Sequence, residues 1–255
     1  MGLDWALVAF EVPDGGAPAA IDAARALRLI GFAVTMPHKT AIAARCDELS
    51  PDAAALNSVN TVTLLPDGRI AGDSTDGPGF LRSLVEAEVD AAGRSVLVLG
   101  AGGAARAVAR ALGGVGARVV VAARNPAAAA RAATLAEGSA IAWDDRGASA
   151  ATSDIIVNAT PIGMDRRTGL AANELGGGEA VVGAEVLGPN QTVVDLVYHP
   201  LETPLLRTAR RQGARAVSGL GMLVHQAALQ VEGWSGRPAP LDAMRAAVTP
   251  EADGS

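Results

Sequence analysis

Cysteine is almost absent from this chain of 255 residues, which contains Cys46 alone. An intramolecular disulfide is therefore excluded, and a reducing cytoplasm is the expected compartment. Aromatic residues are also scarce, at 3% of the sequence, with a single tyrosine. Because small and branched aliphatic residues supply the apolar content instead, we expect a core in which helices pack closely on sheets.

Basic blocks and long apolar runs are missing too. The formal net charge is −6, and without a cluster of Lys or Arg a nucleic-acid partner is not expected. The longest uncharged apolar stretch, residues 216–231, contains His225 and Gln226 and is shorter than a membrane span. The first residues lack the basic start and the cleavage site of a signal peptide. We therefore expect a soluble, cytoplasmic protein without a membrane partner.

Hydrophobic residues make up 49% of the chain and charged residues 19%, which is typical of packed globular domains. Strand-like and helix-like segments alternate, and this predicts an α/β fold of two domains, both with mainly parallel sheets. The predicted strands are residues 5–12, 31–36, 94–100, 117–124, 153–160 and 191–198. The predicted helices are residues 17–30, 39–46, 77–89, 102–116, 125–136, 203–213 and 221–236, and residues 58–75 form a hairpin.

A glycine-rich turn, VLVLGAGGAARA at residues 96–107, joins a predicted strand to a predicted helix. Gly100, Gly102 and Ala105 fit the pattern G-x-G-x-x-A of dinucleotide-binding turns. In such a turn the first glycine allows the bend and the second lets backbone N–H groups approach a pyrophosphate. The predicted contacts to the dinucleotide are Gly100, Ala101, Gly102, Gly103 and Ala104.

The next predicted strand indicates which dinucleotide binds. Sites for NAD carry Asp or Glu about 20 residues further on, to hold the ribose 2′-OH. Here the strand ends instead at Arg124 and Asn125, and a guanidinium pairs well with a 2′-phosphate. We therefore predict NADP (NADPH) as the cofactor, with Arg124 and Asn125 in contact with it. The alternative is that Arg124 is an ordinary exposed arginine.

Two more polar residues stand at the ends of predicted elements. Lys39 follows the apolar segment GFAVTM and Pro37, and the proline favours extended backbone before it. Asp76 lies at the start of a predicted helix, in GDSTDGPGF. Because α/β folds assemble their sites at such ends, both residues are candidates for a site, although a lysine that begins a helix is ordinary when taken alone.

Five segments of the chain, in order, resemble the motifs of the shikimate dehydrogenase family. VTMPHK resembles V-T-x-P-x-K, VNT resembles A-x-N-T, STD resembles N-T-D, NATPIGM resembles N-A-T-x-x-G-M, and residues 219–236 are similar to the closing helix. The resemblance extends over nearly the whole chain. It implies an NADP-dependent oxidoreductase that reversibly reduces 3-dehydroshikimate to shikimate, in the pathway to chorismate and the aromatic amino acids.

The resemblance also implies roles for single residues. Lys39 and Asp76 would be the catalytic residues, reaching the oxygen that gains negative charge as hydride arrives; whether Lys39 transfers the proton stays open. The implied substrate-binding residues are Thr35, Asn60, Tyr198 and Gln226, and the further implied cofactor-binding residues are Thr160, Gly219 and Met222. From the residues alone, Gln226 is equally a helix-surface residue and Tyr198 a core ring.

The same resemblance implies the domain organisation. Residues 1–85 with 222–255 would form the substrate-binding and catalytic domain, and residues 86–221 an NADP-binding Rossmann domain. The substrate would bind in the groove between them, with closure during turnover. We expect a small-molecule substrate as partner and a monomer or homodimer. The three histidines lack neighbours at ligand spacing, so no metal site is predicted.

One family feature is not found. Family members carry, ahead of the motif lysine, a further strand and an S-x-S loop whose hydroxyls hold the substrate carboxylate. This chain begins at MGLDW and has no serine before Lys39. Three explanations stay open: a mis-assigned start or truncated sequence, which we favour, a paralogue for quinate or another cyclic substrate, or a non-catalytic nucleotide-binding protein. The presence of both Lys39 and Asp76 favours an enzyme over the last of these.

Overall fold

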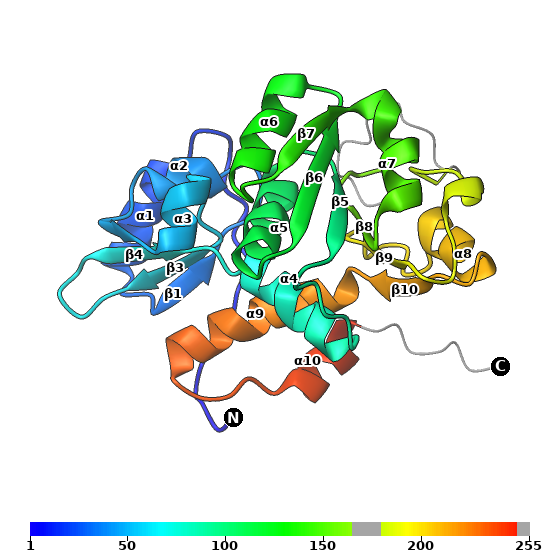
Figure 1. Ribbon diagram of the computed structural model, residues 1–255. Helices are drawn as coiled ribbons and strands as arrows, with labels where there is room; N and C mark the ends of the chain where they lie inside the picture. Colours follow the sequence, from blue (N-terminus) through cyan, green and yellow to red (C-terminus); the bar gives the residue numbers. More distant parts are fainter. Residues whose placement is uncertain (165–179, 249–255) are drawn as a thin grey trace. The chain divides into compact units, whose positions relative to one another are not determined.

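The structure is a computed structural model that describes residues 1–164 and 180–248. The chain divides into two compact units, one of Met1–Asp76 with the chain from Gln226 onward, the other of Gly77–His225 (Figure 1). The predicted bounds were residues 1–85 with 222–255 for one domain and 86–221 for the other. They assign residues 77–85 and 222–225 to the first domain, whereas the structure places these residues in the second unit. As functional domains these bounds stay a prediction, and residues 249–255 lie outside the described residues.

The first unit contains a four-stranded sheet in the described part of the chain. Its order is β1 (Gly31–Ala33), β3 (Thr61–Leu64), β4 (Ile70–Asp73) and β2 (Glu48–Leu49). The pairs β1–β3 and β3–β4 are antiparallel, and only β2–β4 is parallel. The predicted parallel sheet is therefore wrong for this unit, whereas the predicted hairpin is confirmed.

The hairpin turn explains the antiparallel direction. Leu65 N–H donates to the Arg69 carbonyl, and Gly68 N–H donates to the Leu65 carbonyl, both at 2.9 Å. Gly68 has a φ of +86°, a backbone conformation that glycine adopts without strain. Strands joined by so short a turn run in opposite directions, because a parallel pair needs a crossover of a dozen residues or more.

Helices complete the first unit around a core of Ile, Val and Ala side chains. They are α1 (Ala17–Ala26), α2 (Lys39–Ala43), α3 (Pro51–Leu56), α10 (Leu241–Val248) and the part of α9 (Leu220–Ser235) from Gln226 onward. The buried core includes Ile21, Ile42, Val59, Val62 and Ile70. Helix α3 begins with a side-chain cap, since Ser50 Oγ accepts a hydrogen bond from Ala53 N at 3.2 Å.

The strand predicted at residues 5–12 is wrong, because this segment has no regular structure. Trp5, Leu7, Val8 and Phe10 are exposed, and within the described residues no strand pairs with the segment. A β-rich composition forms a strand only beside a partner strand and against a packed surface. The segment has the composition without the partner.

The second unit contains a six-stranded sheet, again counted over the described residues, in which every pair is parallel. This confirms the α/β prediction for the Rossmann region. The order is β10 (Arg215–Ser218), β9 (Thr192–Asp195), β8 (Ile155–Asn158), β5 (Ser95–Leu99), β6 (Arg118–Ala123) and β7 (Ser139–Ala142). Strand order reverses at β5, which is flanked by β6 and β8 and leads into the glycine-rich turn. Ligands of open α/β sheets bind at such a switch point.

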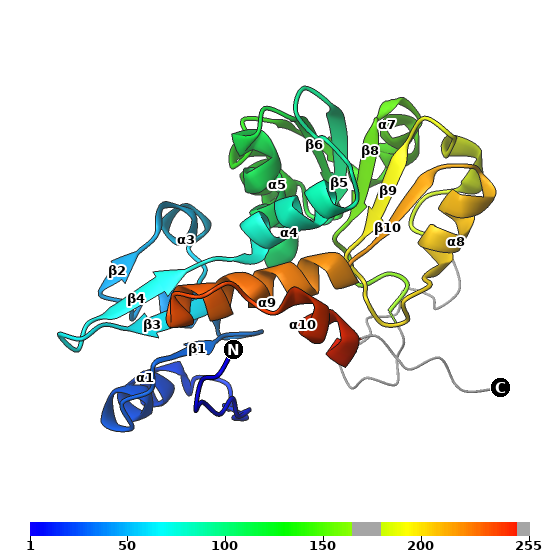
Figure 2. The same cartoon turned by 90° about the horizontal axis from the view of Figure 1, so that it is seen from below.

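Helices cover both faces of this sheet, as Figure 2 shows for α5 and α8. The helices and 3-10 turns are α4 (Asp76–Glu86), α5 (Gly103–Gly114), α6 (Pro126–Thr134), η1 (Trp143–Asp145), α7 (Arg146–Thr152), η3 (Ala184–Val186) and α8 (Pro204–Arg211). In α5 the buried residues Ala105, Val108, Ala109 and Leu112 recur at helical spacing. The expected close packing of small side chains is thus present here.

No helix in the described ranges combines the length and the apolar character that a membrane crossing needs.

Candidate active site

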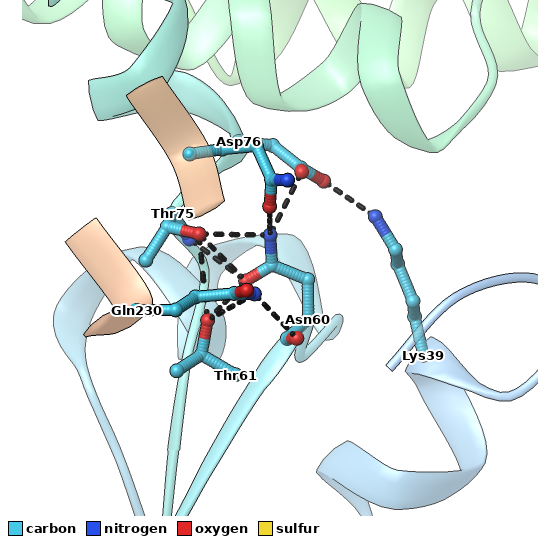
Figure 3. A network of polar contacts seen from close by, with 7 residues as sticks. Lys39, Asn60, Thr61, Thr75, Asp76 and Gln230 are labelled. Carbon is cyan, nitrogen blue, oxygen red and sulfur yellow. Dashed lines mark hydrogen bonds and ion pairs between the residues drawn. The ribbon is translucent and has the colours of Figure 1, made fainter. Parts of the chain in front are cut away.

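Lys39 and Asp76 meet within the first unit. Lys39 is the first residue of α2 and Asp76 the first residue of α4. The Lys39 Nζ lies 2.6 Å from the Asp76 Oδ2 (Figure 3). The two side chains are 23% and 13% exposed, so the pair is largely desolvated and still reachable by a small molecule. A lysine ammonium has three N–H donors, and Asp76 uses one of them.

The backbone around the hairpin places this pair. Asn60, directly before β3, donates its backbone N–H to the Asp73 carbonyl at 3.0 Å. The Lys39 carbonyl accepts from Val59 N–H, also at 3.0 Å. The start of α2 and the end of β4 are therefore both tied to the segment before β3. This explains how residues 37 positions apart in sequence come to share one salt bridge.

Asn60 connects the ion pair to a buried polar network. Its Nδ2 donates to Asp76 Oδ1 at 2.8 Å, so each carboxylate oxygen has a donor. Its Oδ1 accepts from Thr75 N at 2.9 Å and from Thr61 Oγ1 at 2.8 Å. Gln230 Nε2 donates to the Asn60 carbonyl and to Thr61 Oγ1, both at 3.1 Å. Such networks hold side chains in one arrangement when every polar group is paired.

The predicted substrate-binding residues have different environments. Asn60 belongs to this network, and Gln226 is half-buried and accepts from Asn60 Nδ2 at 3.4 Å, so Gln226 is not a free helix-surface residue. Thr35 is exposed beyond the end of β1. Tyr198 belongs to the second unit and is 42% exposed, which rules out a core ring. Their contacts with substrate stay predictions.

Three members of the network were not predicted from the sequence: Thr61, Thr75 and Gln230. The two threonines adjoin predicted residues in VNT and STD, which is a usable signal. Gln230 follows Gln226 by four residues on α9, so both lie on the same helix face. That spacing was the available indication for Gln230.

The glycine-rich turn of the second unit has the geometry that a dinucleotide requires. Gly100 has a φ of +108°, and a Cβ there would lie 2.9 Å from the Ala159 carbonyl oxygen. Helix α5 begins at Gly103, and no atom lies within 4 Å of a Cβ built on Gly102 or Gly103. That open, exposed space in front of the first N–H groups of a 12-residue helix is where a pyrophosphate fits. The residues present therefore fit the predicted cofactor.

The end of β6 presents Arg124 to solvent. It follows Ala123 at the end of the strand that pairs with β5, so it stands next to the strand that carries the glycine-rich turn. Asn125 has a structural role, because its Oδ1 caps α6 by accepting from Ala128 N at 3.0 Å. An exposed guanidinium at this place suits a 2′-phosphate.

The carboxyl ends of β8 and β9 carry a second polar network. Thr160 Oγ1 donates to Asn158 Oδ1 at 2.6 Å, and Asn158 Nδ2 donates to Asp195 Oδ1 at 2.8 Å. Asp195 is 0% exposed, and burial raises its pKa to about 6 even though Thr203, Val197 and Asn158 donate hydrogen bonds to it. Of these residues only Thr160 was predicted. The pairing fixes the Thr160 hydroxyl next to the glycine-rich turn.

Gly219 and Met222, the other predicted cofactor residues, have evident packing roles. A Cβ on Gly219 would lie 2.5 Å from the Leu196 carbonyl oxygen, so a side chain does not fit. Met222 is buried in the core of the second unit. Their cofactor contacts stay predictions.

The absence of a metal site also stays a prediction. In the described residues no group of three or more His, Cys, Asp or Glu side chains could hold a metal ion.

Comparison with known proteins decides the family. Three family descriptions match: "Shikimate dehydrogenase substrate binding domain" at residues 1–62, "Shikimate / quinate 5-dehydrogenase" at residues 83–163, and "Shikimate 5'-dehydrogenase C-terminal domain" at residues 219–249. The shikimate dehydrogenase (NADP(+)) of Symbiobacterium thermophilum is 43% identical, over 96% of this chain and 84% of its own. This chain belongs to the shikimate dehydrogenase family. The resemblance read from the five motifs is confirmed.

Solved structures of the family share the two-domain α/β fold. Shikimate 5-dehydrogenase from Listeria monocytogenes, in complex with shikimate and NAD, matches with a TM-score of 0.88 and 32% identity, over 97% of this chain and 87% of that one. Quinate dehydrogenase from Corynebacterium glutamicum, in complex with NAD, matches with a TM-score of 0.81 and 31% identity, over 89% and 80%. The family therefore includes members named for either substrate.

Proposed function

We propose that this protein is an NADP-dependent shikimate dehydrogenase that reversibly reduces 3-dehydroshikimate to shikimate. Membership of the family and the name of the 43% identical relative support the reaction and the cofactor. The observation that carries the proposal is the 2.6 Å pair of Lys39 Nζ and Asp76 Oδ2, next to the amide groups of Asn60 and Gln226.

The chemistry of the pair suits reduction of a ketone. NADPH, when bound, supplies the hydride, and the carbonyl oxygen of the substrate then gains negative charge. Lys39 stabilises that charge by donating a hydrogen bond from one of the two N–H groups that Asp76 does not use. Asp76 orients the ammonium and balances its charge. The amide of Gln226 suits the hydroxyls of a polyhydroxylated ring, because an amide both donates and accepts, whereas the amide of Asn60 holds Asp76.

The second unit supports the choice of cofactor. Gly102 and Gly103 leave space for a pyrophosphate, and Arg124 offers a guanidinium to a 2′-phosphate. Ala128, four residues further on in α6, carries no charge. The preference for NADP over NAD therefore depends on Arg124. The proposal includes a cytoplasmic location and a monomer or homodimer, which the lone cysteine and the family resemblance favour.

The decisive experiment follows NADP reduction spectrophotometrically with shikimate and quinate side by side. The expected result is turnover with shikimate that exceeds turnover with quinate. Lys39→Ala should lower kcat by about 10²- to 10⁴-fold and leave the dissociation constant of NADP nearly unchanged, because the glycine-rich turn is intact. A loss of NADP affinity in this variant would make Lys39 structural rather than catalytic.

Quinate is the second candidate substrate. The Corynebacterium quinate dehydrogenase matches this chain with a TM-score of 0.81, and one matching family description names both compounds. Higher kcat/KM with quinate than with shikimate would replace the first proposal by this one. Absence of turnover with either, while NADP still binds, would favour a nucleotide-binding protein without catalysis.

A further inference from the structure

Gln230 has a buried side-chain amide, and its hydrogen-bond partners determine which way the amide faces. It lies on α9 and is 5% exposed. Its Nε2 lies 3.1 Å from both the Asn60 carbonyl oxygen and Thr61 Oγ1. A backbone carbonyl accepts hydrogen bonds and never donates them, so the N–H₂ end of Gln230 must face it. Both N–H groups of Gln230 are therefore used, one on each partner.

The direction of the Gln230 bond determines what the Thr61 hydroxyl has left to offer, which is its proton. Since Thr61 Oγ1 accepts from Gln230, its single proton is available to Asn60 Oδ1 at 2.8 Å, which is closer than its other partner, Thr75 Oγ1, at 3.4 Å. Thr75 N–H, which only donates, points to the same oxygen at 2.9 Å. These two donors hold the oxygen end of the Asn60 amide, and the Thr75 hydroxyl lies slightly farther from it, at 3.3 Å. Its Nδ2 end must then face Asp76 Oδ1 at 2.8 Å (Figure 3).

We propose that Gln230 and Thr61 are positioning residues for the Lys39–Asp76 pair, because together with Thr75 N–H they hold the Asn60 amide in place with its Nδ2 end toward Asp76. With the amide reversed, two acceptor oxygens would face each other, and the carboxylate would turn away from the ammonium. The inference rests on the proposed function, in which the pair contacts the substrate. It adds two residues that contribute to turnover without contact with substrate or cofactor.

Paired variants test this role through kcat. Thr61→Val removes the hydroxyl at nearly constant shape and should lower kcat by about 10- to 100-fold, because small misplacements of catalytic groups have effects of that size. Thr61→Ser keeps the hydroxyl and should stay close to the parent protein. Gln230→Glu replaces a donor by a carboxylate, whose oxygens repel the Asn60 carbonyl and attract the Thr61 proton. This variant should therefore lower kcat more than Gln230→Met does. The KM for NADP should change less than about twofold in all four.

Trp234 supplies a matched control on the same helix. One turn beyond Gln230, its Nε1 donates to the Val62 carbonyl on β3 at 3.1 Å, a bond of the same kind outside the path to Asn60. Trp234→Phe should lower the melting temperature without lowering kcat. If Thr61→Val and Gln230→Glu behave like Trp234→Phe, with reduced stability and unchanged kcat, their role is only structural and the inference is overturned.

A second measurement needs no activity. Solvent exchange of the Asn60 side-chain N–H₂ protons, followed by NMR, should be slow in the parent protein and faster in Thr61→Val and Gln230→Glu, with Trp234→Phe unchanged. The parent protein could fail to reduce NADP with shikimate, quinate or any other cyclic hydroxy acid, while the Asn60 exchange rates change as expected. In that case the proposed function is wrong and the positioning role stands. Unchanged exchange in both variants overturns the positioning, whatever the activity.

Discussion

At the scale of single residues, Asp195 shows burial and hydrogen bonding acting in opposite directions. Three donors surround its carboxylate, yet the loss of water dominates and raises the pKa from 3.8 to about 6. No sequence pattern indicates this, because the donors come from positions 2, 8 and 37 residues away. A buried, fully hydrogen-bonded acid at the end of a strand is visible only in three dimensions.

Asp195→Asn should change how stability depends on pH. Because the folded pKa is raised, the folded state keeps a proton that the unfolded state loses between pH 3.8 and about 6. The free energy of unfolding of the parent protein therefore falls as pH rises through this window, by about 3 kcal/mol in total. Asparagine has no proton to lose, so the stability of the variant relative to its parent should rise by roughly 2 kcal/mol from pH 4.5 to 7. Urea unfolding at the two pH values measures this.

Asp154 provides the control for that experiment. Hydrogen bonds from Ser95 lower its pKa, so its stabilising contribution is present above pH 3.8 and is lost only at more acidic pH. The stability of Asp154→Asn relative to the parent should accordingly stay nearly level between pH 4.5 and 7. An equally level difference for Asp195→Asn would show that its carboxyl titrates normally in the folded protein.

At the scale of elements, the sequence predicted what depends on local pattern. The strand–turn–helix around Gly100 has a dense apolar strand, fixed glycines and a helical period, and it forms as expected. Strands β2, β7 and β10 were missed because they are short and carry few buried side chains. A strand was predicted at residues 5–12 and does not form, because the residues of a segment do not show whether a partner strand is available.

The two ends of the glycine-rich turn should respond differently to an added methyl group. Gly100→Ala strains a residue with φ of +108° and brings Cβ to 2.9 Å from Ala159 O, so the melting temperature and NADP affinity should both fall. Gly102→Ala meets no atom within 4 Å and has φ of −74°, so the fold should keep its stability. Its methyl group instead enters the space assigned to the pyrophosphate and should weaken NADP binding.

Calorimetry for stability and fluorescence titration for NADP affinity separate these effects. Gly114, an exposed glycine at the end of α5 with open space around its Cβ position, gives a control in Gly114→Ala, which should bind NADP normally. Normal affinity in Gly102→Ala would mean that the pyrophosphate binds elsewhere.

At the scale of the whole molecule, five motifs in order were enough to predict the family, and Lys39 and Asp76 with it. The motifs name residues, but they do not say how those residues are held. The support from Thr61 and Gln230 depends on contacts between positions 169 residues apart, which no local pattern encodes. The sheet of the first unit was mispredicted for a related reason: the predicted hairpin sets only β3 against β4, whereas the antiparallel pairing of β1 with β3 joins segments far apart in sequence.

The central claim is that Lys39 and Asp76 act as one unit on the oxygen that gains charge. A double-mutant cycle of Lys39→Met, Asp76→Asn and the combined variant measures this most directly, with kcat for shikimate oxidation as the readout. We expect each single change to lower kcat by about 10²- to 10⁴-fold. The kcat of the combined variant should then lie within about threefold of the kcat of the slower single variant. Effects that multiply in the combined variant would show two independent residues and would contradict the account.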